Sequence, residues 1–268
     1  MSEEKTTMEK EKSILPDITN IKTQETFTLP SKGLVYDKTD GIGSSITLRR
    51  MTTKEDKLRM RNESEDKIRR DILQACILDE GVNAGKLKLA DANFLLFKLR
   101  VISLLDDTYK LQLVCPNCSS EFIHEVNLSD LNINYMTKEK IKNMEIILPL
   151  SQVKIGLKLP CLDDIIKMSD KLKEYFNKFP NVDRSEAIYT TSAMLYIKDV
   201  NGQTMMNEEL EDWLDNMDII DNRAFRKKLS EIDDIFGINT DMKCECPNCN
   251  SVVNHGLPIT SELFNPSL

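Results

Sequence analysis

The sequence predicts an α+β fold in which antiparallel β-hairpins enclose a helical insertion. Residues 108–114 and 121–128 alternate between apolar and polar side chains, which is typical of half-buried strands. Residues 161–237 instead carry apolar side chains at helical spacing. The tetrapeptide Cys-Pro-Asn-Cys occurs at 115–118 and again at 246–249, on either side of that helical stretch and each time between strand-like residues. This repeat indicates that two distant parts of the chain meet.

The repeated tetrapeptide also predicts a structural zinc site. A Cys-x-x-Cys turn between two strands presents both thiolates on one side, and two such turns supply the four ligands of a tetrahedral, zinc-ribbon-like site. The predicted Zn2+ ligands are Cys115, Cys118, Cys246 and Cys249. Four thiolates leave no position open for water or substrate. A thioredoxin-like redox pair is less favoured because neither copy begins a helix. Two unrelated structural turns are the remaining alternative.

Two residues near these turns are further candidate ligands. Cys244 lies two residues before Cys246 on the same strand face, so it is a reserve ligand that could replace one of the four. His124 shares a strand face with apolar residues, and a packed or rim histidine is favoured there because four cysteines already complete a site. In a reducing compartment, Cys76 and Cys161 are expected to remain free thiols.

Composition and charge narrow the class of protein and of partner. The chain has 268 residues, of which 40% are hydrophobic and 30% charged, as in globular proteins. Its net charge of −8 disfavours nucleic acid, because binding phosphates requires an excess of Lys and Arg on one face. No apolar run approaches the roughly 18 residues that span a bilayer, and the first residues do not resemble a signal peptide. We therefore expect a cytoplasmic protein with protein partners, no nucleic acid and no membrane span.

The order of the patterns predicts four parts. Residues 1–24 are polar and lack periodicity, so they are expected to form a flexible N-terminal tail, with an arm that orders on a partner as the alternative. Residues 25–160 form an α+β domain with the first zinc knuckle, and residues 161–237 form the helical insertion. Residues 238–268 contribute the strand of the second knuckle and a C-terminal segment that completes the first domain.

Local signals predict the elements within these parts. A glycine-containing turn at 41–43 joins two strand-like stretches into a hairpin. Thr52-Thr53-Lys54-Glu55 has the form of a capping box and opens a helix. Apolar spacing then predicts two amphipathic helices, a further strand pair and four helices in the insertion. In order, the ranges are 27–36, 46–48, 53–62, 68–77, 91–105, 145–150, 152–159, 162–176, 187–200, 207–217 and 221–236.

Residues 208–221 carry seven acidic side chains and no basic one. The stretch is either a docking surface for a basic partner or the solvated side of a helix that buries Leu210, Trp213, Leu214 and Met217, and the second interpretation is favoured. A cation site is less favoured, because no glycine-containing loop or alternating pattern of oxygen ligands accompanies the acids.

Several stretches occur in an order that is typical of one protein family. They are residues 27–36, 46–55 and 91–100, the first Cys-x-x-Cys with Val126-Asn127-Leu128 after it, and the second Cys-x-x-Cys followed by Leu263-Phe264-Asn265-Pro266. In this order the chain resembles the T4-type phage baseplate proteins, which include the baseplate hub assembly proteins of contractile-tailed phages. The resemblance covers most of residues 26–268. The chain departs from it at Leu263-Phe264, where family members often carry two aromatic residues.

The resemblance implies a structural or assembly component of a phage tail baseplate, in its central hub, which acts by binding other tail baseplate or hub proteins. It implies the host cell cytoplasm as the location during assembly and, if the protein is retained, the baseplate of the virion tail. It implies no catalysis. Independently, the sequence has two histidines and no Gly-x-Ser-x-Gly, phosphate-binding glycine loop or His-Glu-x-x-His.

Two other functions remain as alternatives. A cytoplasmic zinc-ribbon protein that binds nucleic acid is the second, and the acids Glu121, Glu125 and Glu245 beside the knuckles disfavour it. An enzyme ranks third. For the favoured function we expect the binding interface near the zinc-pinned hairpins, with Phe264 as its sharpest candidate anchor. Phe94, Phe97 and Ile72 are expected to fill the core instead, and no catalytic or cofactor-binding residues are predicted.

Overall fold

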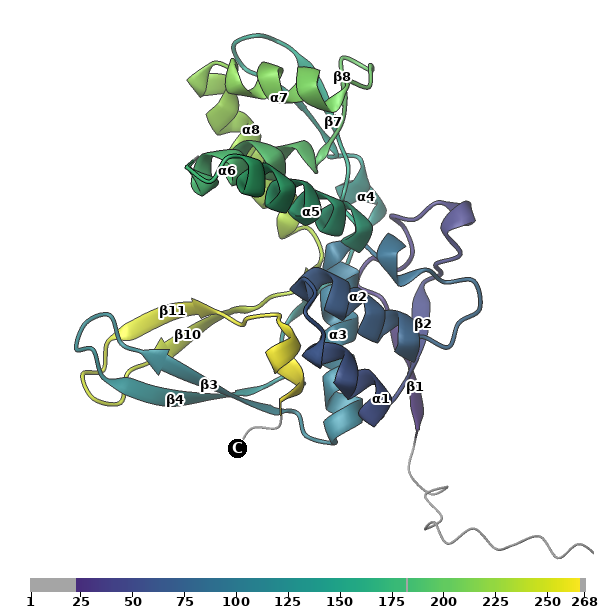
Figure 1. Cartoon of the computed structure of the whole chain (residues 1–268), viewed down its shortest axis with the longest axis vertical. Helices are drawn as coiled ribbons and strands as arrows, with labels where there is room; N and C mark the ends of the chain where they lie inside the picture. Colours follow the sequence, from purple (N-terminus) through teal and green to yellow (C-terminus); the bar gives the residue numbers. More distant parts are fainter. Residues whose placement is uncertain (1–22, 182, 266–268) are drawn as a thin grey trace, which may run out of the picture.

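The computed structural model describes residues 23–181 and 183–265. The predicted tail at 1–24 lies outside this range except for its last two residues, and Gln24 already begins a strand. Figure 1 shows two lobes, one around α2 and α3 and the other around α5 to α8, with an arm of two β-hairpins projecting from the first. The strand pairs of the described residues are all antiparallel, as the sequence predicts. No helix within these residues is long and apolar enough to cross a membrane.

The first lobe begins with a hairpin and a capped helix. β1 (Gln24–Thr28) pairs with β2 (Ser45–Arg49), and the predicted capping box is present at Thr52, whose backbone N–H donates to Glu55 Oε2 at 2.8 Å. The helix predicted over 53–62 is shorter than expected. It divides into α1 (Thr53–Asp56) and a 3-10 turn, η2 (Lys57–Met60).

Helix α3 (Leu89–Leu104) is the centre of this lobe. The sequence predicts an amphipathic helix here, but apolar side chains surround α3 on nearly all sides, and it is correspondingly buried. Phe94 packs edge-on against Phe27 of β1, with ring centroids 6.4 Å apart. Helix α2 (Glu65–Cys76) covers α3 with its apolar stripe, which includes Ile72. Phe94, Phe97 and Ile72 therefore fill the core, as predicted.

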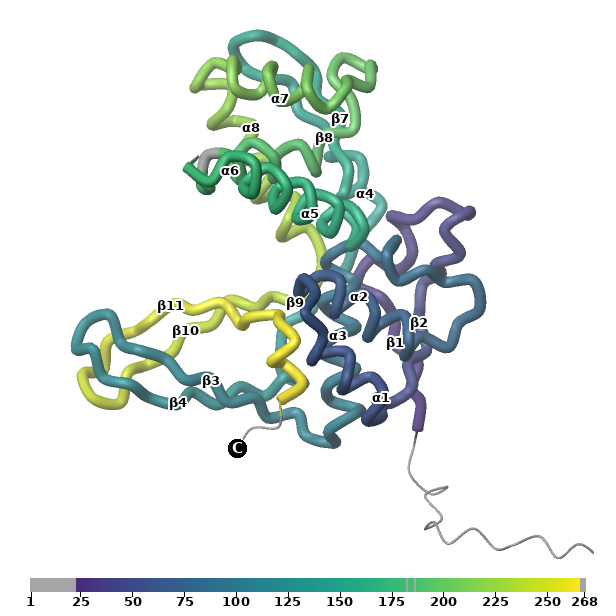
Figure 2. Tube along the Cα trace, viewed as in Figure 1, coloured from purple at the N-terminus to yellow at the C-terminus, as the bar shows by residue number. Residues whose placement is uncertain are grey.

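Figure 2 shows the two hairpins of the arm lying side by side. Apolar side chains from both hairpins are buried in one hydrophobic cluster. β3 (Thr108–Val114) pairs with β4 (Glu121–Asn127), and β10 (Asp241–Glu245) pairs with β11 (Val252–Gly256). Alternate residues point inward from both hairpins, in keeping with the period of two along a strand. The inward-facing residues belong to the same hydrophobic cluster as α2 and α3, and include Tyr109, Leu111, Leu113, Phe122, Val126, Met242, Cys244 and Val253.

The second lobe has its own hydrophobic cluster and its own sheet. β6 (Glu145–Ile147), β7 (Lys154–Leu157) and β8 (Ile197–Val200) form a three-stranded sheet in that order. Its cluster joins side chains of β7 and β8 to others from the lobe's helices. The strands β6 and β7, predicted in the α+β domain of residues 25–160, thus pack with the insertion. The remaining elements are α4 (Lys138–Ile141), α5 (Leu162–Lys178), α6 (Arg184–Met194), α7 (Asn207–Asp215), α8 (Ile219–Asp233), β5 (Ile133–Asn134), β9 (Gly237–Ile238) and the 3-10 turns η1 (Lys38–Asp40), η3 (Ala84–Lys86) and η4 (Ser261–Phe264).

The helix predicted over 187–200 is wrong at its C-terminal end. Helix α6 stops at Met194, and β8 occupies Ile197–Val200. Apolar spacing fits either state over four residues. β7 decides between them, because its free edge pairs with β8, with Ile155 opposite Val200.

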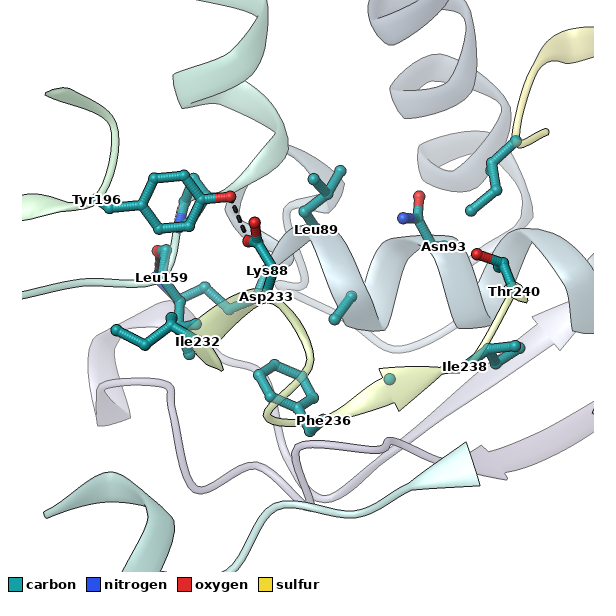
Figure 3. Close-up of a pocket in the computed structure, with 14 residues that line it drawn as sticks. Lys88, Leu89, Asn93, Leu159, Tyr196, Ile232, Asp233, Phe236, Ile238 and Thr240 are labelled. Carbon is teal, nitrogen blue, oxygen red and sulfur yellow. Dashed lines mark hydrogen bonds between the residues drawn. The ribbon is translucent and has the colours of Figure 1, made fainter. Parts of the chain in front are cut away.

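The two lobes meet around a cavity of about 250 Å³ (Figure 3). Leu89 and Asn93 of α3 line it from the first lobe, and Ile232 and Asp233 of α8 line it from the second. The Tyr196 hydroxyl donates a hydrogen bond to Asp233, and both side chains are drawn in Figure 3. Burial raises the pKa of the Asp233 carboxyl. We interpret this cavity as part of the junction between the lobes.

Phe264 is not the exposed anchor that the sequence predicts. It lies in η4 and is 3% exposed, and Leu263 beside it is fully buried. The turn is held by Glu65 of α2, which accepts hydrogen bonds from the Ser261 backbone N–H at 2.8 Å and from its hydroxyl at 3.1 Å. The C-terminal segment therefore closes the core of the first lobe.

Truncation of this side chain is expected to destabilise the fold. Phe264→Ala should lower the free energy of unfolding by about 3 kcal/mol, because it removes a buried ring and leaves a cavity. Ile123→Ala is the matched control, since Ile123 is 66% exposed and should change stability by less than about 0.5 kcal/mol. Urea denaturation of both variants measures the difference. Equal values for the two would show that Phe264 does not belong to the core.

The Glu55 carboxyl is expected to make the free energy of unfolding depend on pH. Hydrogen bonds from the Arg49 guanidinium, the nearest at 2.8 Å, and from Thr52 lower the pKa of the Glu55 carboxyl from 4.5 to about 2. Because the pKa is lower in the folded protein, this contribution is fully present above about pH 4.5 and is lost as the pH falls towards 2. Urea midpoints between pH 7 and pH 3 should decline less in Glu55→Gln than in wild type. The exposed Glu80→Gln should behave as wild type.

Candidate metal centre

The two Cys-x-x-Cys turns have the same backbone conformation. In the first, the Cys115 N–H donates to Ser120 O at 2.9 Å, and the Ser119 N–H donates to Cys115 O at 2.9 Å. In the second, the Cys246 N–H donates to the carbonyl oxygen of Ser251, and Asn250 occupies the position of Ser119. Ser119 and Asn250 both have left-handed backbones, with φ of 58° and 57°. The repeated sequence thus folds into a repeated turn.

The four predicted ligands lie together at the tip of the arm. The sulfur atoms of Cys115, Cys118, Cys246 and Cys249 are all within 4.8 Å of one another. Cys115 Sγ lies 3.7 Å from Cys249 Sγ, and Cys118 Sγ lies 3.7 Å from Cys246 Sγ. All four are free thiols, and these separations are far longer than the roughly 2 Å of a disulfide bond. They agree with the edge of about 3.8 Å of a sulfur tetrahedron around a metal about 2.3 Å from each ligand.

Serine hydroxyls surround the sulfur atoms. Ser251 Oγ lies 3.0 Å from Cys249 Sγ and 3.3 Å from Cys115 Sγ. Ser120 Oγ lies 3.0 Å from Cys118 Sγ and 3.4 Å from Cys246 Sγ. Each hydroxyl thus reaches one sulfur from each turn. Hydrogen-bond donors around ligand atoms are typical of metal sites, where they orient the ligands.

Two asparagines complete this shell of donors. The Asn117 side-chain amide donates to Cys249 Sγ, and the Asn248 amide donates to Cys118 Sγ, both at 3.6 Å. Each asparagine belongs to one turn and reaches a cysteine of the other. The sequence predictions named the cysteines only and missed these serines and asparagines. The sequence does contain a pattern that points to them, because the asparagine and the serine recur at the same positions of the longer repeat Cys-Pro-Asn-Cys-x-Ser, at 115–120 and at 246–251.

These hydrogen bonds favour the thiolate form that binds metals. Donation from the Ser120 hydroxyl and N–H, together with the Asn248 amide, lowers the pKa of Cys118 to about 5. The Ser251 hydroxyl similarly lowers the pKa of Cys115. Within the same cluster, the Ser120 hydroxyl favours the thiolate of Cys246, but burial and the Cys115 thiol outweigh it and raise the pKa of Cys246. Outside the cluster, burial raises the pKa of Cys76 to about 12 and also raises that of Cys161. The hydrogen bonds at the arm tip thus stabilise the thiolates of Cys118 and Cys115.

The other candidate ligands do not join the cluster. Cys244 is buried inside the arm opposite Val253, and burial raises the pKa of its thiol. His124 is half-buried opposite Leu111 on β3. Within the described residues, the four cysteines are the one group of three or more Cys, His, Asp or Glu side chains close enough to share an ion.

The acidic stretch at 208–221 is mostly the solvated side of a helix. In α7, Leu210 and Leu214 are buried, while the acidic side chains are exposed. Asp221 differs, since it is buried and accepts hydrogen bonds from the Leu150 and Ser151 N–H groups at 2.7 and 2.9 Å. The favoured interpretation of the stretch is therefore confirmed for α7, and Asp221 has a structural role in holding the turn after β6.

Comparison with known proteins identifies the family. The family model described as T4 bacteriophage base plate protein matches residues 22–265, which is nearly all of the described chain. No curated protein and no solved structure matches the chain. The match includes both cysteine turns, both lobes and η4. The chain belongs to the T4 bacteriophage base plate protein family.

Proposed function

We propose that this protein is a structural or assembly component of the central hub of the phage tail baseplate, and that it acts by binding other tail baseplate or hub proteins. Membership of the base plate family over residues 22–265 is the observation that carries the proposal. It supports a place in the virion tail among other phage structural proteins. The hub is the narrower part of the proposal, and with it we assign no enzymatic activity.

The four-cysteine cluster is proposed to hold one structural Zn2+. The sulfur separations of 3.7 Å and the lowered pKa of Cys118 support this assignment. When bound, zinc would supply a rigid link between the tips of two hairpins that are separated in sequence by the whole second lobe. Four cysteine ligands leave no coordination position for a substrate. The proposed role of the site is therefore to fix the relative position of the two hairpin tips, with no reaction at the metal.

The outer face of the arm is the proposed interface. Val114 and Ile123 are 60% and 66% exposed and lie diagonally across β3 and β4 on this face. Val252 of β11 is 62% exposed near the same tip. Apolar side chains held on a rigid projection suit a docking contact of fixed orientation. This keeps the predicted location near the zinc-pinned hairpins while replacing Phe264 as its anchor.

Co-expression with the other baseplate proteins of the same phage tests this interface. We expect a complex that Ile123→Glu weakens while zinc content and unfolding temperature stay unchanged. Ile147→Glu is the matched control, because Ile147 is 59% exposed on the second lobe. No complex with any tail protein would contradict the proposed function, whereas equal weakening by both variants would contradict the assignment to the arm.

The presence of the protein in the finished phage particle can be tested separately. We propose the host cell cytoplasm during assembly and the tail baseplate as the final location. Mass spectrometry of purified particles should detect the chain at a fixed ratio to other baseplate proteins. If the chain occurs only in infected-cell extracts, it leaves after assembly and acts as an assembly factor.

Nucleic acid is proposed not to be a partner. Glu121, Glu125 and Glu245 are exposed on the arm, beside the cysteine turns that a nucleic-acid-binding zinc ribbon would use. Lys110 Nζ lies 3.8 Å from Glu125 Oε1, so the glutamate partly compensates the positive charge of the lysine. A salt-dependent gel shift of labelled DNA or RNA by micromolar protein would contradict this and would favour the zinc-ribbon alternative.

A further inference from the structure

Helix α5 presents an apolar stripe that neither hydrophobic cluster covers. Its first turns bury Leu162 and Ile166. On a different face of the helix, Met168, Leu172 and Tyr175 recur at spacings of four and three residues and form a second stripe. Met168 and Leu172 are half-buried and Tyr175 is exposed, and none of the three packs in either cluster. An amphipathic helix of a globular protein normally buries this face against its own core. The stripe therefore has surface available for contact with another molecule.

The stripe forms one wall of a groove of about 360 Å³. Residues of α6 and of the start of α7 also line it. Figure 1 shows α5 and α6 side by side in the second lobe. The apolar lining includes Met168, Leu172, Ala187, Met194 and Leu195. Tyr175 also lines the groove and contacts the half-exposed Phe179, with ring centroids 5.1 Å apart. The lining of the groove is thus largely apolar and includes an aromatic ring.

The rim of the groove is mostly positive. Lys158, Lys167 and Lys171 line it. None of the three has a carboxylate oxygen of a described residue within 4.0 Å, although the charge of Lys158 acts on the Asp164 carboxyl. Asp164 also lines it, but its carboxylate accepts a hydrogen bond from the Cys161 N–H at 3.1 Å as a helix cap. Glu211 of α7 is the other acid of the lining. In a chain of net charge −8, this grouping of lysines is a local reversal of sign.

We propose that this groove binds an amphipathic helix of a partner protein, with an apolar face and carboxylates along its flanks. The apolar face would insert between α5 and α6, as in other complexes where a helix occupies a groove. Its carboxylates would lie beside Lys158, Lys167 and Lys171, where their charge is complementary. The inference rests on the proposed function in that the natural partner is another baseplate protein, but the groove lies on the second lobe, away from the zinc-pinned arm.

Synthetic peptides test the chemistry of the groove directly. The probe is an amphipathic helical peptide with leucines on one face and glutamates on its flanks, and its match has lysines in place of the glutamates. We expect the wild-type chain to bind the glutamate peptide at least about tenfold more tightly, as measured by fluorescence anisotropy at low salt. Equal binding of both peptides, or no binding of either, would overturn the proposal.

Charge reversal within the groove sharpens this test. The double variant Lys167→Glu and Lys171→Glu should lose the preference for the glutamate peptide and bind the lysine peptide more tightly than wild type does. The control is Lys173→Glu with Lys178→Glu, which makes the same charge change on exposed positions of α5 outside the groove lining and should leave both affinities unchanged. Equal effects of the two double variants would show a general charge effect and no groove site.

Co-purification with the other baseplate proteins separates this inference from the proposed function. A complex that the groove variant weakens and the control variant does not would support both. A complex unaffected by the groove variant would overturn the groove and leave the proposed function standing. Binding of the glutamate peptide without any baseplate complex would support the groove and contradict the proposed function. If wild type self-associates and the groove variant is monomeric, the occupant is a second copy of the chain, which would overturn the proposed partner.

Discussion

Replacing Cys118 or Cys249 with serine is expected to abolish zinc binding and to unfold both tips of the arm together. Metal binding to a four-thiolate site contributes directly to folding, with apparent values of about 10–16 kcal/mol in zinc-finger peptides. The two hairpins are otherwise two-stranded, a form that is marginally stable by itself. Loss of one ligand should therefore lower the unfolding temperature and increase amide exchange in β3, β4, β10 and β11 at once.

Elemental analysis of the purified wild-type chain should show one zinc per chain, and Cys118→Ser should show far less than one. Cys244→Ser is the matched control, because Cys244 lies in the same arm but outside the cluster. It should retain zinc even if the polar hydroxyl costs some stability in the buried site. Absence of stoichiometric metal in the wild type would contradict the zinc assignment. Loss of zinc in Cys244→Ser would show that the reserve ligand is a real one.

Replacing Arg100 with leucine is expected to have the second largest effect. Arg100 is fully buried on α3, and burial lowers the pKa of its guanidinium. Its Nε donates to Leu263 O at 2.8 Å, its Nη1 to Asp106 O at 2.7 Å and its Nη2 to Thr108 O at 2.9 Å. One side chain thus joins the central helix to the C-terminal turn and to the base of the arm.

Arg100→Leu should lower the free energy of unfolding by about 3 kcal/mol or more, because one buried and two partly buried carbonyl groups lose their donor. Arg100→Lys should lose less stability than Arg100→Leu but remain less stable than wild type, since an ammonium cannot reproduce the three divergent N–H groups of the guanidinium. Arg223→Leu on the exposed side of α8 should change stability by less than about 0.5 kcal/mol. Urea denaturation of the three variants measures this order. A loss in Arg100→Leu no larger than in Arg223→Leu would contradict the structural role.

Local patterns in the sequence determined the parts of this protein that depend on neighbouring residues. Strand alternation at 108–114 and 121–128 predicted β3 and β4, because side chains alternate across a strand regardless of what the strand packs against. The capping box at Thr52 predicted the start of α1, since both of its hydrogen bonds lie within one turn. The four cysteines were predicted as a group because each Cys-x-x-Cys turn presents two thiolates and a tetrahedral site requires four ligands.

Tertiary structure decided the features that depend on distant partners. β8 became a strand because the free edge of β7 offered hydrogen bonds, which no pattern within residues 197–200 records. Phe264 became a core residue because Glu65 of α2 anchors the turn that carries it. The asparagines of the cysteine turns acquired their role only when each turn met the other. The apolar stripe of α5 is visible in sequence, but only the packing of the two lobes shows that neither core covers it, because burial depends on the whole chain and periodicity on a single helix.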